Sequence, residues 1–197
     1  SQRIKKWLLE LDWKFFLSVT FYQYDPVSKK INEVKTGNLL NIKSKPYRHR
    51  NFIFDIDFTK SDNQTIYLKI IGKRYIIPLY IWSKPEFIYQ TQKEYIYFGL
   101  YYGLVLVMIL YNLFIFISLK NSYYLYYILY LLASCLFIFS FNGLGFTFFW
   151  GDFPLYNIMA PILYSPLLLF FLINFASSLL ETKKYTPKFH RFLTVLM

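Results

Sequence analysis

The chain has 197 residues, of which 56% are hydrophobic, 23% aromatic and only 17% charged. This composition is too apolar for an ordinary soluble domain, so the apolar excess must be buried elsewhere. The formal net charge of +11 fits a solvated basic surface, or anionic glycans or lipid headgroups as partners. The positive charge does not indicate a nucleic-acid partner, because a basic surface that lies outside a membrane does not meet nucleic acid.

The charged residues are concentrated in the first half of the chain. Residues 1–95 contain 17 Lys and Arg against 9 Asp and Glu, whereas residues 96–197 contain 5 and 2. In the second half, long apolar runs are interrupted only by Lys120 and Asp152 before Glu181. Such runs are typical of bilayer spans. The sequence therefore predicts a water-soluble segment followed by a membrane region.

Residues 1–82 carry the pattern of short antiparallel strands. Apolar and polar residues alternate at 16–22 and 52–58, and further strands are expected at 65–71 and 75–82. Turn residues separate these runs at 25–30, 36–38, 61–64 and 72–74. The pattern predicts an all-β, jelly-roll-like sandwich. Because no disulfide can brace so thin a core, we expect it to be N-terminally incomplete, with further strands before Ser1.

A polar connector at residues 83–94 is expected to lead from the sandwich into the membrane. Pro85 suits a helix start, and Glu86 lies where an acidic side chain favours the helix N-terminus. The membrane region, residues 95–197, is predicted to be an α-helical bundle. Its expected spans are 96–119, 123–146 and 156–180, and a fourth begins near residue 192.

The short loops between the spans predict the orientation. The first contains Lys120, the second has no Lys or Arg, and Lys183 to Arg191 follow the third span. Because Lys-rich and Arg-rich loops stay in the cytoplasm, the N-terminal segment is expected to be extracytoplasmic.

Catalytic and metal-binding patterns are absent from the sequence. The histidines are His49 and His190, and the spans carry no Asp, Glu, Lys or Arg. Asp55 and Asp57 lie on one edge of a strand and fit a solvated face better than a catalytic pair. We therefore expect no catalytic residue, no metal site and no cofactor in this chain, which disfavours a membrane enzyme or transporter.

Small and polar residues in the spans are candidates for helix packing or signal relay. Gly99 and Gly103 form a Gly-xxx-Gly pattern, read either as close packing or as the face of a homodimer. Asn112 and Asn142 can hydrogen-bond to neighbouring helices. Helix packing is the simpler interpretation of all four.

The densest basic and aromatic cluster of the soluble segment is the loop 45–50. Its candidate ligand-binding residues are Tyr47, Arg48 and Arg50, since guanidinium groups bind carboxylates or hydroxyls and a Tyr ring stacks on sugars. The alternative is an ordinary solvated loop.

Several short motifs occur together in an order that resembles one receptor family. They are Trp7-Leu-Leu-Glu-Leu, Thr36-Gly37, Arg50-Asn-Phe-Ile-Phe54, Ile66-Tyr-Leu-Lys-Ile70, Ile77-Pro-Leu-Tyr-Ile-Trp82, Phe98-Gly-Leu-Tyr-Tyr-Gly103, Leu110-Tyr-Asn-Leu-Phe114, Ser122-Tyr-Tyr-Leu-Tyr-Tyr127 and Asn142-Gly-Leu-Gly-Phe146. The chain resembles the bacterial seven-transmembrane receptors with diverse intracellular signalling modules. The chain departs from that family at one position: the residue before the proline that follows the Thr-Gly turn is usually Arg in such domains and is Lys45 here.

The resemblance implies a sensor in the bacterial cytoplasmic membrane, with three of seven helices present. Its extracellular sandwich would receive a small-molecule or carbohydrate ligand, and its helices would pass the signal to a cytoplasmic output domain in the same polypeptide. That output is a histidine kinase, a nucleotide cyclase or a phosphatase in such receptors. The alternative is a membrane-anchored carbohydrate-binding or adhesion domain without signalling.

Overall fold

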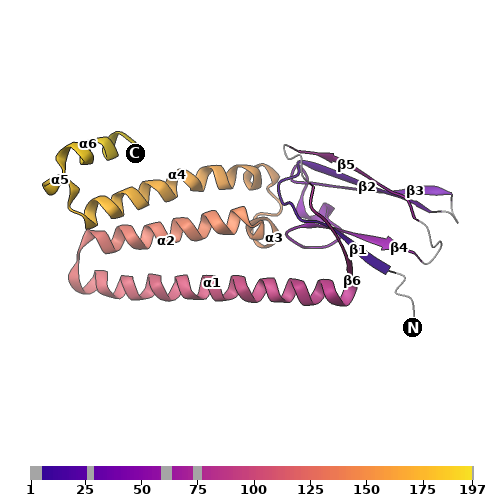
Figure 1. The fold of residues 1–197 in the computed structure, drawn as a ribbon, viewed down its shortest axis with the longest axis horizontal. Helices are drawn as coiled ribbons and strands as arrows, with labels where there is room; N and C mark the ends of the chain where they lie inside the picture. The colour runs from indigo at the N-terminus through magenta and orange to yellow at the C-terminus, as the bar shows by residue number, and fades with distance from the viewer. Residues whose placement is uncertain (1–5, 26–28, 59–63, 73–76, 197) are drawn as a thin grey trace. The chain divides into compact units, whose positions relative to one another are not determined.

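The computed structural model describes residues 6–25, 29–58, 64–72 and 77–196. Its strands are β1 (Lys6–Leu11), β2 (Ser18–Asp25), β3 (Lys30–Thr36), β4 (Phe52–Asp57), β5 (Ile66–Ile71) and β6 (Leu79–Ser83), with a short 3-10 helix, η1, at Ile42–Ser44. The helices are α1 (Lys84–Leu119), α2 (Ser122–Phe141), α3 (Leu144–Phe148), α4 (Pro154–Leu179), α5 (Thr182–Tyr185) and α6 (Pro187–Leu196) (Figure 1).

The strands form two three-stranded antiparallel sheets, ordered β4-β1-β6 and β3-β2-β5. In the first sheet Leu9 pairs with Phe54 on one side and Ile81 on the other. In the second sheet Phe21 lies between Val34 and Leu68. The predicted sandwich is confirmed.

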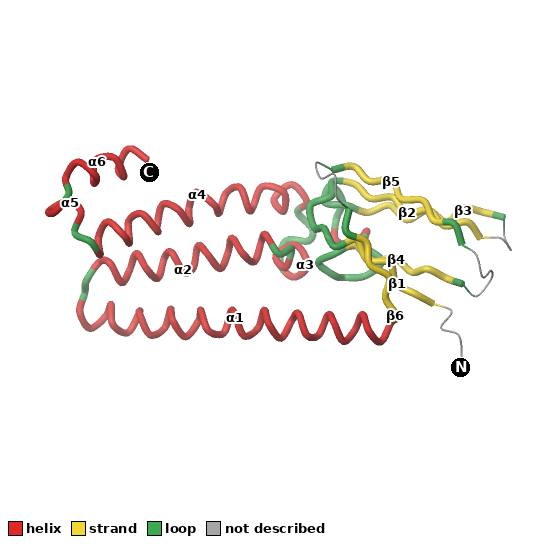
Figure 2. The backbone as a smooth tube through the Cα atoms, in the orientation of Figure 1, coloured by secondary structure: helices red, strands yellow, loops and turns green. Residues whose placement is uncertain are grey.

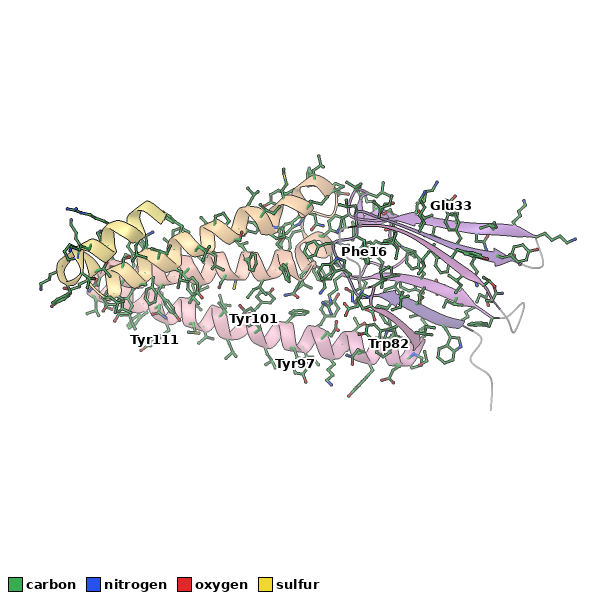
Figure 3. The ribbon with its side chains drawn as sticks, turned by 45° about the horizontal axis from the view of Figure 1, so that its top comes forward. Phe16, Glu33, Trp82, Tyr97, Tyr101 and Tyr111 are labelled. Atoms are coloured by element: carbon green, nitrogen blue, oxygen red, sulfur yellow. The ribbon has the colours of Figure 1, made fainter. Side chains whose placement is uncertain are left out.

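Aromatic rings from both sheets fill the core of the sandwich. Phe21 and Phe54 stack with their ring centroids 4.8 Å apart and their planes 3° apart. Phe16, which is labelled in Figure 3, is fully buried. Its ring centroid lies 6.4 Å from that of Phe52. The period-two alternation places these rings on the inner faces, where burial of apolar surface stabilises the fold.

The turn predicted at 36–38 follows β3 directly. Gly37 has a φ of +143°, and a Cβ there would lie 2.4 Å from the Leu17 carbonyl oxygen. Glycine is therefore required by both the backbone conformation and the close approach. The turns predicted at 61–64 and 72–74 fall largely on residues that the structure does not describe.

Strand β6 continues into helix α1 without a loop. The Ser83 hydroxyl accepts a hydrogen bond from the Glu86 N–H at 3.4 Å, and α1 begins at Lys84. The connector predicted at 83–94 is thus the first part of one 36-residue helix. A helical connector transmits rotation and translation, whereas a flexible linker does not.

Helices α1, α2 and α4, the three long helices of Figure 2, are long and apolar enough to cross a membrane. Helix α2 ends at Phe141, before the predicted end at Phe146, because Gly143 adopts a left-handed φ of 73°. Residues 144–148 form the separate helix α3. The predicted start of a fourth span near residue 192 lies within α6.

The chain folds as two compact units. The sandwich unit comprises residues 1–95 and 142–159, and the helix unit comprises residues 96–141 and 160–197. In the helix unit, Tyr102 of α1 contacts Phe139 of α2 edge-on, with ring centroids 5.8 Å apart. The sandwich unit includes α3, so the segment between α2 and α4 belongs structurally with the strands.

Candidate functional site

The segment between α2 and α4, residues 142–153, is bound to the sandwich by hydrogen bonds; we call it the α2–α4 loop. The Ile42 N–H donates to the Gly151 carbonyl at 2.9 Å. Arg48 Nε donates to the Thr147 carbonyl, also at 2.9 Å. The sandwich residues in these contacts come from the segment 41–48, which we call the η1 loop.

Side-chain amides extend this attachment at the start of α4. Asn38 Nδ2 donates to the Lys14 carbonyl, and Asn38 Oδ1 accepts from Asn157 Nδ2 at 3.3 Å. Trp150 Nε1 in turn donates to Asn157 Oδ1 at 3.3 Å. Asn38 and Asn157 are almost fully buried, with 1% and 3% exposed. Buried amides with satisfied partners fix one arrangement of the segments that they join.

Glycine at position 151 allows the two loops to approach closely. A Cβ there would lie 2.4 Å from Ile42 Cγ2 and 2.7 Å from the Phe146 carbonyl oxygen. Any other residue would therefore push the η1 loop away.

An exposed ionic contact lies at the rim of this attachment. Asn41 Oδ1 accepts from the Lys43 N–H at 2.9 Å, which orients its amide so that Nδ2 donates to Asp152 Oδ1 at 2.5 Å. Lys43 Nζ lies 3.7 Å from the same carboxylate oxygen. The Asn41 hydrogen bond and the Lys43 charge hold the pKa of Asp152 below its usual value.

A cleft of about 540 Å³ lies between the η1 loop and the α2–α4 loop. It is lined by Ile42, Lys43, Lys45, Pro46, Arg48, Phe148, Phe149, Gly151 and Asp152. Phe148 and Phe149 are 54% and 76% exposed, although they are large apolar residues. The exposure of these two neighbouring rings beside basic groups makes the cleft a candidate binding surface.

Lys45 lines the cleft but is used by the fold. Its Nζ donates to the carbonyls of His49 and Arg50 at 3.0 and 3.1 Å and lies 4.4 Å from the centroid of the Phe52 ring. Burial lowers the pKa of Lys45 to about 7. This ammonium organises the 45–50 loop rather than facing solvent.

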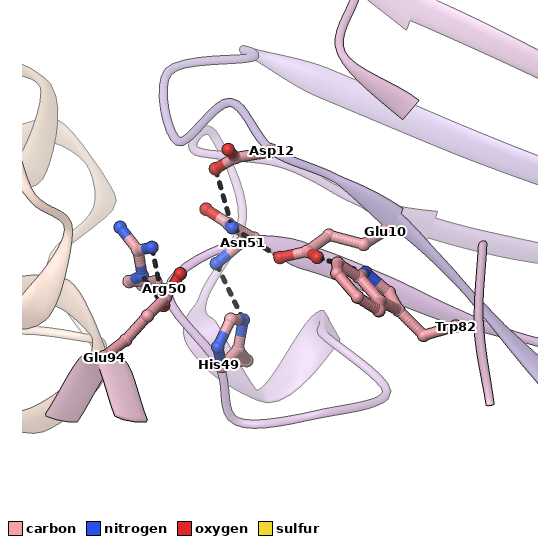
Figure 4. A network of polar contacts seen from close by, with 7 residues as sticks. All are labelled: Glu10, Asp12, His49, Arg50, Asn51, Trp82 and Glu94. Carbon is pink, nitrogen blue, oxygen red and sulfur yellow. Dashed lines mark hydrogen bonds and ion pairs between the residues drawn. The ribbon is translucent and has the colours of Figure 1, made fainter. Parts of the chain in front are cut away.

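A buried polar network lies behind the same loop (Figure 4). Asn51 Nδ2 donates to Glu10 Oε1 at 2.6 Å and to Asp12 Oδ1 at 2.8 Å. Trp82 Nε1 donates to Glu10 Oε2 at 2.7 Å. Burial raises the pKa of Glu10, although the hydrogen bonds from Asn51 and Trp82 act in the opposite direction. The network joins β1, β6 and the residue before β4.

His49 and Arg50 connect that network to the first part of α1. The Asn51 N–H donates to His49 Nδ1 at 3.1 Å, and the His49 ring contacts Phe87 edge-on at 5.3 Å. Arg50 Nη2 and Nε donate to Glu94 Oε2 at 2.6 and 3.1 Å. Burial, with Arg50 and Lys45 nearby, lowers the pKa of His49 to about 3.

The structure places the three predicted ligand-binding residues in three different surroundings. Arg48 lines the cleft, whereas Arg50 pairs with Glu94. The Tyr47 hydroxyl donates a hydrogen bond to Asp55 Oδ1 at 2.7 Å, and both residues line a second depression of about 380 Å³. Burial and the nearby Asp55 raise the pKa of Tyr47 to about 12. They therefore do not form one surface, and their role in binding stays a prediction.

The predicted relay residues are also dispersed. Among the residues that the structure describes, a Cβ at Gly99 or Gly103 would meet no atom within 4 Å, so this face of α1 is open. Asn112 donates to the Met108 carbonyl of its own helix at 2.8 Å. Asn142 lies in the break after α2 rather than inside a span. Their roles in packing or relay remain predictions.

Sequence reasoning missed the residues that hold the site together, chiefly Glu10, Asn38, Asn51, Gly151 and Asn157. One signal was available, because Glu10 is an acidic residue within the apolar run Trp7-Leu-Leu-Glu-Leu. Buried polar residues of this kind require partners. Within residues 6–25, 29–58, 64–72 and 77–196, no group of three His, Cys, Asp or Glu side chains is placed to hold a metal ion.

Comparison with known proteins identifies two family models that match the chain, one after the other. Residues 94–197 match the family described as 7TM diverse intracellular signalling, and residues 1–83 match the one described as 7TMR-DISM extracellular 2. No curated protein and no solved structure matches the chain. The resemblance seen in the sequence is confirmed, and the chain belongs to the seven-transmembrane receptors with diverse intracellular signalling modules.

Proposed function

We propose that this chain is the sensor and transmembrane part of a bacterial receptor in the cytoplasmic membrane. Its sandwich lies outside the cytoplasm, binds a small ligand and relays that event to a cytoplasmic output domain in the same polypeptide. Family membership supports the receptor role. The excess of Lys and Arg after the third span, at Lys183 to Arg191, supports the orientation.

The observation that carries this proposal is the attachment of the α2–α4 loop to the sandwich. A change in the η1 loop reaches the ends of α2 and α4 through the contacts of Ile42 and Arg48. A change that extends to Arg50, two residues after this loop, reaches α1 through the Arg50–Glu94 ion pair. Three helices are thus connected to the strands, one by direct continuation of β6 and two through the α2–α4 loop. A ligand that favours one position of this loop would shift the helices accordingly.

The ligand site in this proposal is the cleft beside Arg48, and the ligand is a small saccharide or anion. Tyr47 and Arg50 flank Arg48 in the loop 45–50. A ligand that moves Arg48 therefore also strains the contacts of Tyr47 with Asp55 and of Arg50 with Glu94. The chain itself contributes binding and relay rather than chemistry. Turnover of any metabolite by residues 1–197 alone would contradict this part.

The relay is tested by removing contacts that do not line the cleft. In the full-length receptor, Asn38→Ala combined with Asn157→Ala removes the buried amide pair. A ligand is first found by a glycan and metabolite screen. We then expect its affinity to be retained while the ligand-dependent output falls by roughly 5-fold to 150-fold, the usual range of allosteric coupling.

Asn32→Ala is the matched control, because Asn32 is an exposed amide on the edge strand β3. It should leave both affinity and output unchanged. Undiminished output in the Asn38 and Asn157 double variant would refute the relay. Alkaline phosphatase fused after Asp152 and after Lys188 tests the orientation, and activity only at the second site would reverse it.

A further inference from the structure

We infer that the cleft binds the oxyanion of its ligand, a carboxylate or a phosphate, in competition with Asp152, which occupies that position as an internal anion. This inference names the ligand class of the site in the proposed function and rests on it. It follows from the donors that converge on the cleft, from the weak hold on Asp152 and from the apolar wall beside them.

The donors are Lys43 and Arg48, which line the cleft, and Asn41, which contacts the lining residue Asp152; all three belong to the η1 loop. The Asn41 amide and the Lys43 ammonium converge on one oxygen, Oδ1 of Asp152. Within the described contacts, Arg48 uses only Nε, which donates to Thr147, so both Nη groups remain available. A guanidinium with two available nitrogens beside an ammonium and an amide is a suitable set for a carboxylate or a phosphate.

Asp152 occupies this donor set without being buried in it. Its side chain is 62% exposed, and that of Lys43 is 83% exposed. An exposed ion pair is weak because water and salt screen it. The Arg48 charge already acts on Asp152, but among the described contacts Arg48 donates no hydrogen bond to it. A ligand oxyanion that accepts hydrogen bonds from the Arg48 Nη groups can therefore displace Asp152.

Displacement of Asp152 would alter the attachment of the α2–α4 loop. Asp152 is the residue after Gly151, whose carbonyl accepts from the Ile42 N–H. Loss of the Asn41 and Lys43 contacts leaves this backbone hydrogen bond as the nearest remaining attachment. Anion binding thus acts on the contact that the proposed relay uses.

The apolar wall of the cleft fits the remainder of the ligand. Phe148 and Phe149 are exposed beside the basic donors, and such rings can contact the carbon skeleton of a metabolite or the acyl region of a phospholipid. The oxyanion then belongs either to a soluble ligand or to a lipid headgroup. The chemistry recognised by the cleft is the same in both cases.

The experiment uses the full chain in phosphatidylcholine nanodiscs, titrated with inorganic phosphate by calorimetry at low salt. Arg48→Ala is expected to weaken phosphate binding at least 10-fold, and Arg48→Lys less. Asp152→Asn is expected to tighten binding about 5-fold to 10-fold because the internal competitor is gone. Glu33→Gln removes one negative charge from the exposed strand β3 and should change nothing.

Repeating the titration in phosphatidylglycerol nanodiscs distinguishes the sources. Loss of phosphate binding there assigns the cleft to a lipid headgroup, and equal binding in both membranes assigns it to a soluble ligand. Phosphate affinity that does not respond to Asp152→Asn, or responds equally to Glu33→Gln, overturns the inference. If Asp152 variants change the affinity for phosphate but leave the output of the full-length receptor unchanged, the proposed relay is contradicted instead.

Discussion

Asparagine side chains make different contacts in the sandwich unit and in the helix unit. In the sandwich unit, Asn51 and Asn38 bond to groups far away in the sequence, such as Glu10 and Asn157. In the helix unit, Asn112 and Asn174 donate to carbonyls of their own helices four residues earlier. The first arrangement specifies a tertiary structure, whereas the second satisfies the amide and leaves the helix face open.

The small residues of the two units follow the same division. Gly37 and Gly151 of the sandwich unit lie where a Cβ would collide with neighbouring atoms, but Gly99 and Gly103 of the helix unit face open space. Tyr97 and Tyr111 on α1 are also largely exposed, with 61% and 65% accessible (Figure 3). The sandwich unit is therefore closely packed around its polar contacts, while α1 presents surface for lipid or further helices. Substitutions in the two units should have very different effects.

The largest effect is expected from Asn51→Leu. The amide separates the carboxylates of Glu10 and Asp12 and donates a hydrogen bond to each. Without it, two acidic groups lose a shared donor in a buried site, which should cost about 3 kcal/mol of unfolding free energy. Chemical unfolding of the purified chain in detergent measures this, with exposed Asn32→Leu as the control. A loss equal to that of the control would mean that the network contributes no stability.

Acidification should affect the sandwich unit through His49. Its pKa of about 3 in the fold lies below the ordinary value of 6.5. The stabilising contribution of the neutral imidazole is therefore present above pH 6.5 and is lost as the pH falls toward 3. Between pH 6 and 4.5 the wild-type chain should lose about 2 kcal/mol relative to His49→Gln, which does not titrate. Parallel stability curves for the two proteins over this range would show that His49 is not held neutral.

Gly151→Ala should have a smaller effect that is specific to the attachment of the α2–α4 loop. The added methyl group meets Ile42 Cγ2 and forces the two loops apart, at a cost of about 1 kcal/mol. Ile42→Ala in the same chain should restore part of this loss, because it removes the colliding group. The measurement is a double-mutant cycle on unfolding free energies. Additive effects of the two substitutions would mean that Ile42 and residue 151 are not in contact.

Much of this architecture was predictable because its signals are local. The alternation at 16–22 and 52–58 indicated strands, the apolar runs indicated the spans, and Pro85 and Glu86 indicated the helix start. The break after α2 was missed because the apolar run continues through Leu144 to Phe149, so only the left-handed conformation of Gly143 ends the helix.

The candidate site was predictable only as a segment. The loop 45–50 was identified from its charge and aromatic residues, but its contacts depend on partners distant in the sequence. Arg50 meets Glu94, 44 residues away, and Arg48 meets Thr147, 99 residues away. Neither partner carries a local signal, since an acidic residue just before an apolar span and a threonine in an apolar run are both ordinary. The three-dimensional fold alone decides which guanidinium remains available.

The smallest effect on the isolated chain is expected from Gly99→Leu combined with Gly103→Leu, and this prediction sharpens the comparison most. A Cβ at either position meets no atom of the described part of the chain within 4 Å. The unfolding free energy of residues 1–197 should therefore change by less than about 0.5 kcal/mol. If the open face of α1 binds another helix in the full-length receptor, the same leucines should disrupt that contact, because close approach of two helices requires small residues. Cross-linking in membranes and size-exclusion chromatography of the full-length receptor would then show loss of a dimer, or loss of folded monomer if the partner helix belongs to the same chain.

Tyr97→Phe together with Tyr111→Phe is the control on the same helix. An unchanged full-length receptor would mean that this face of α1 contacts lipid, and the Gly-xxx-Gly pattern would then have no packing role.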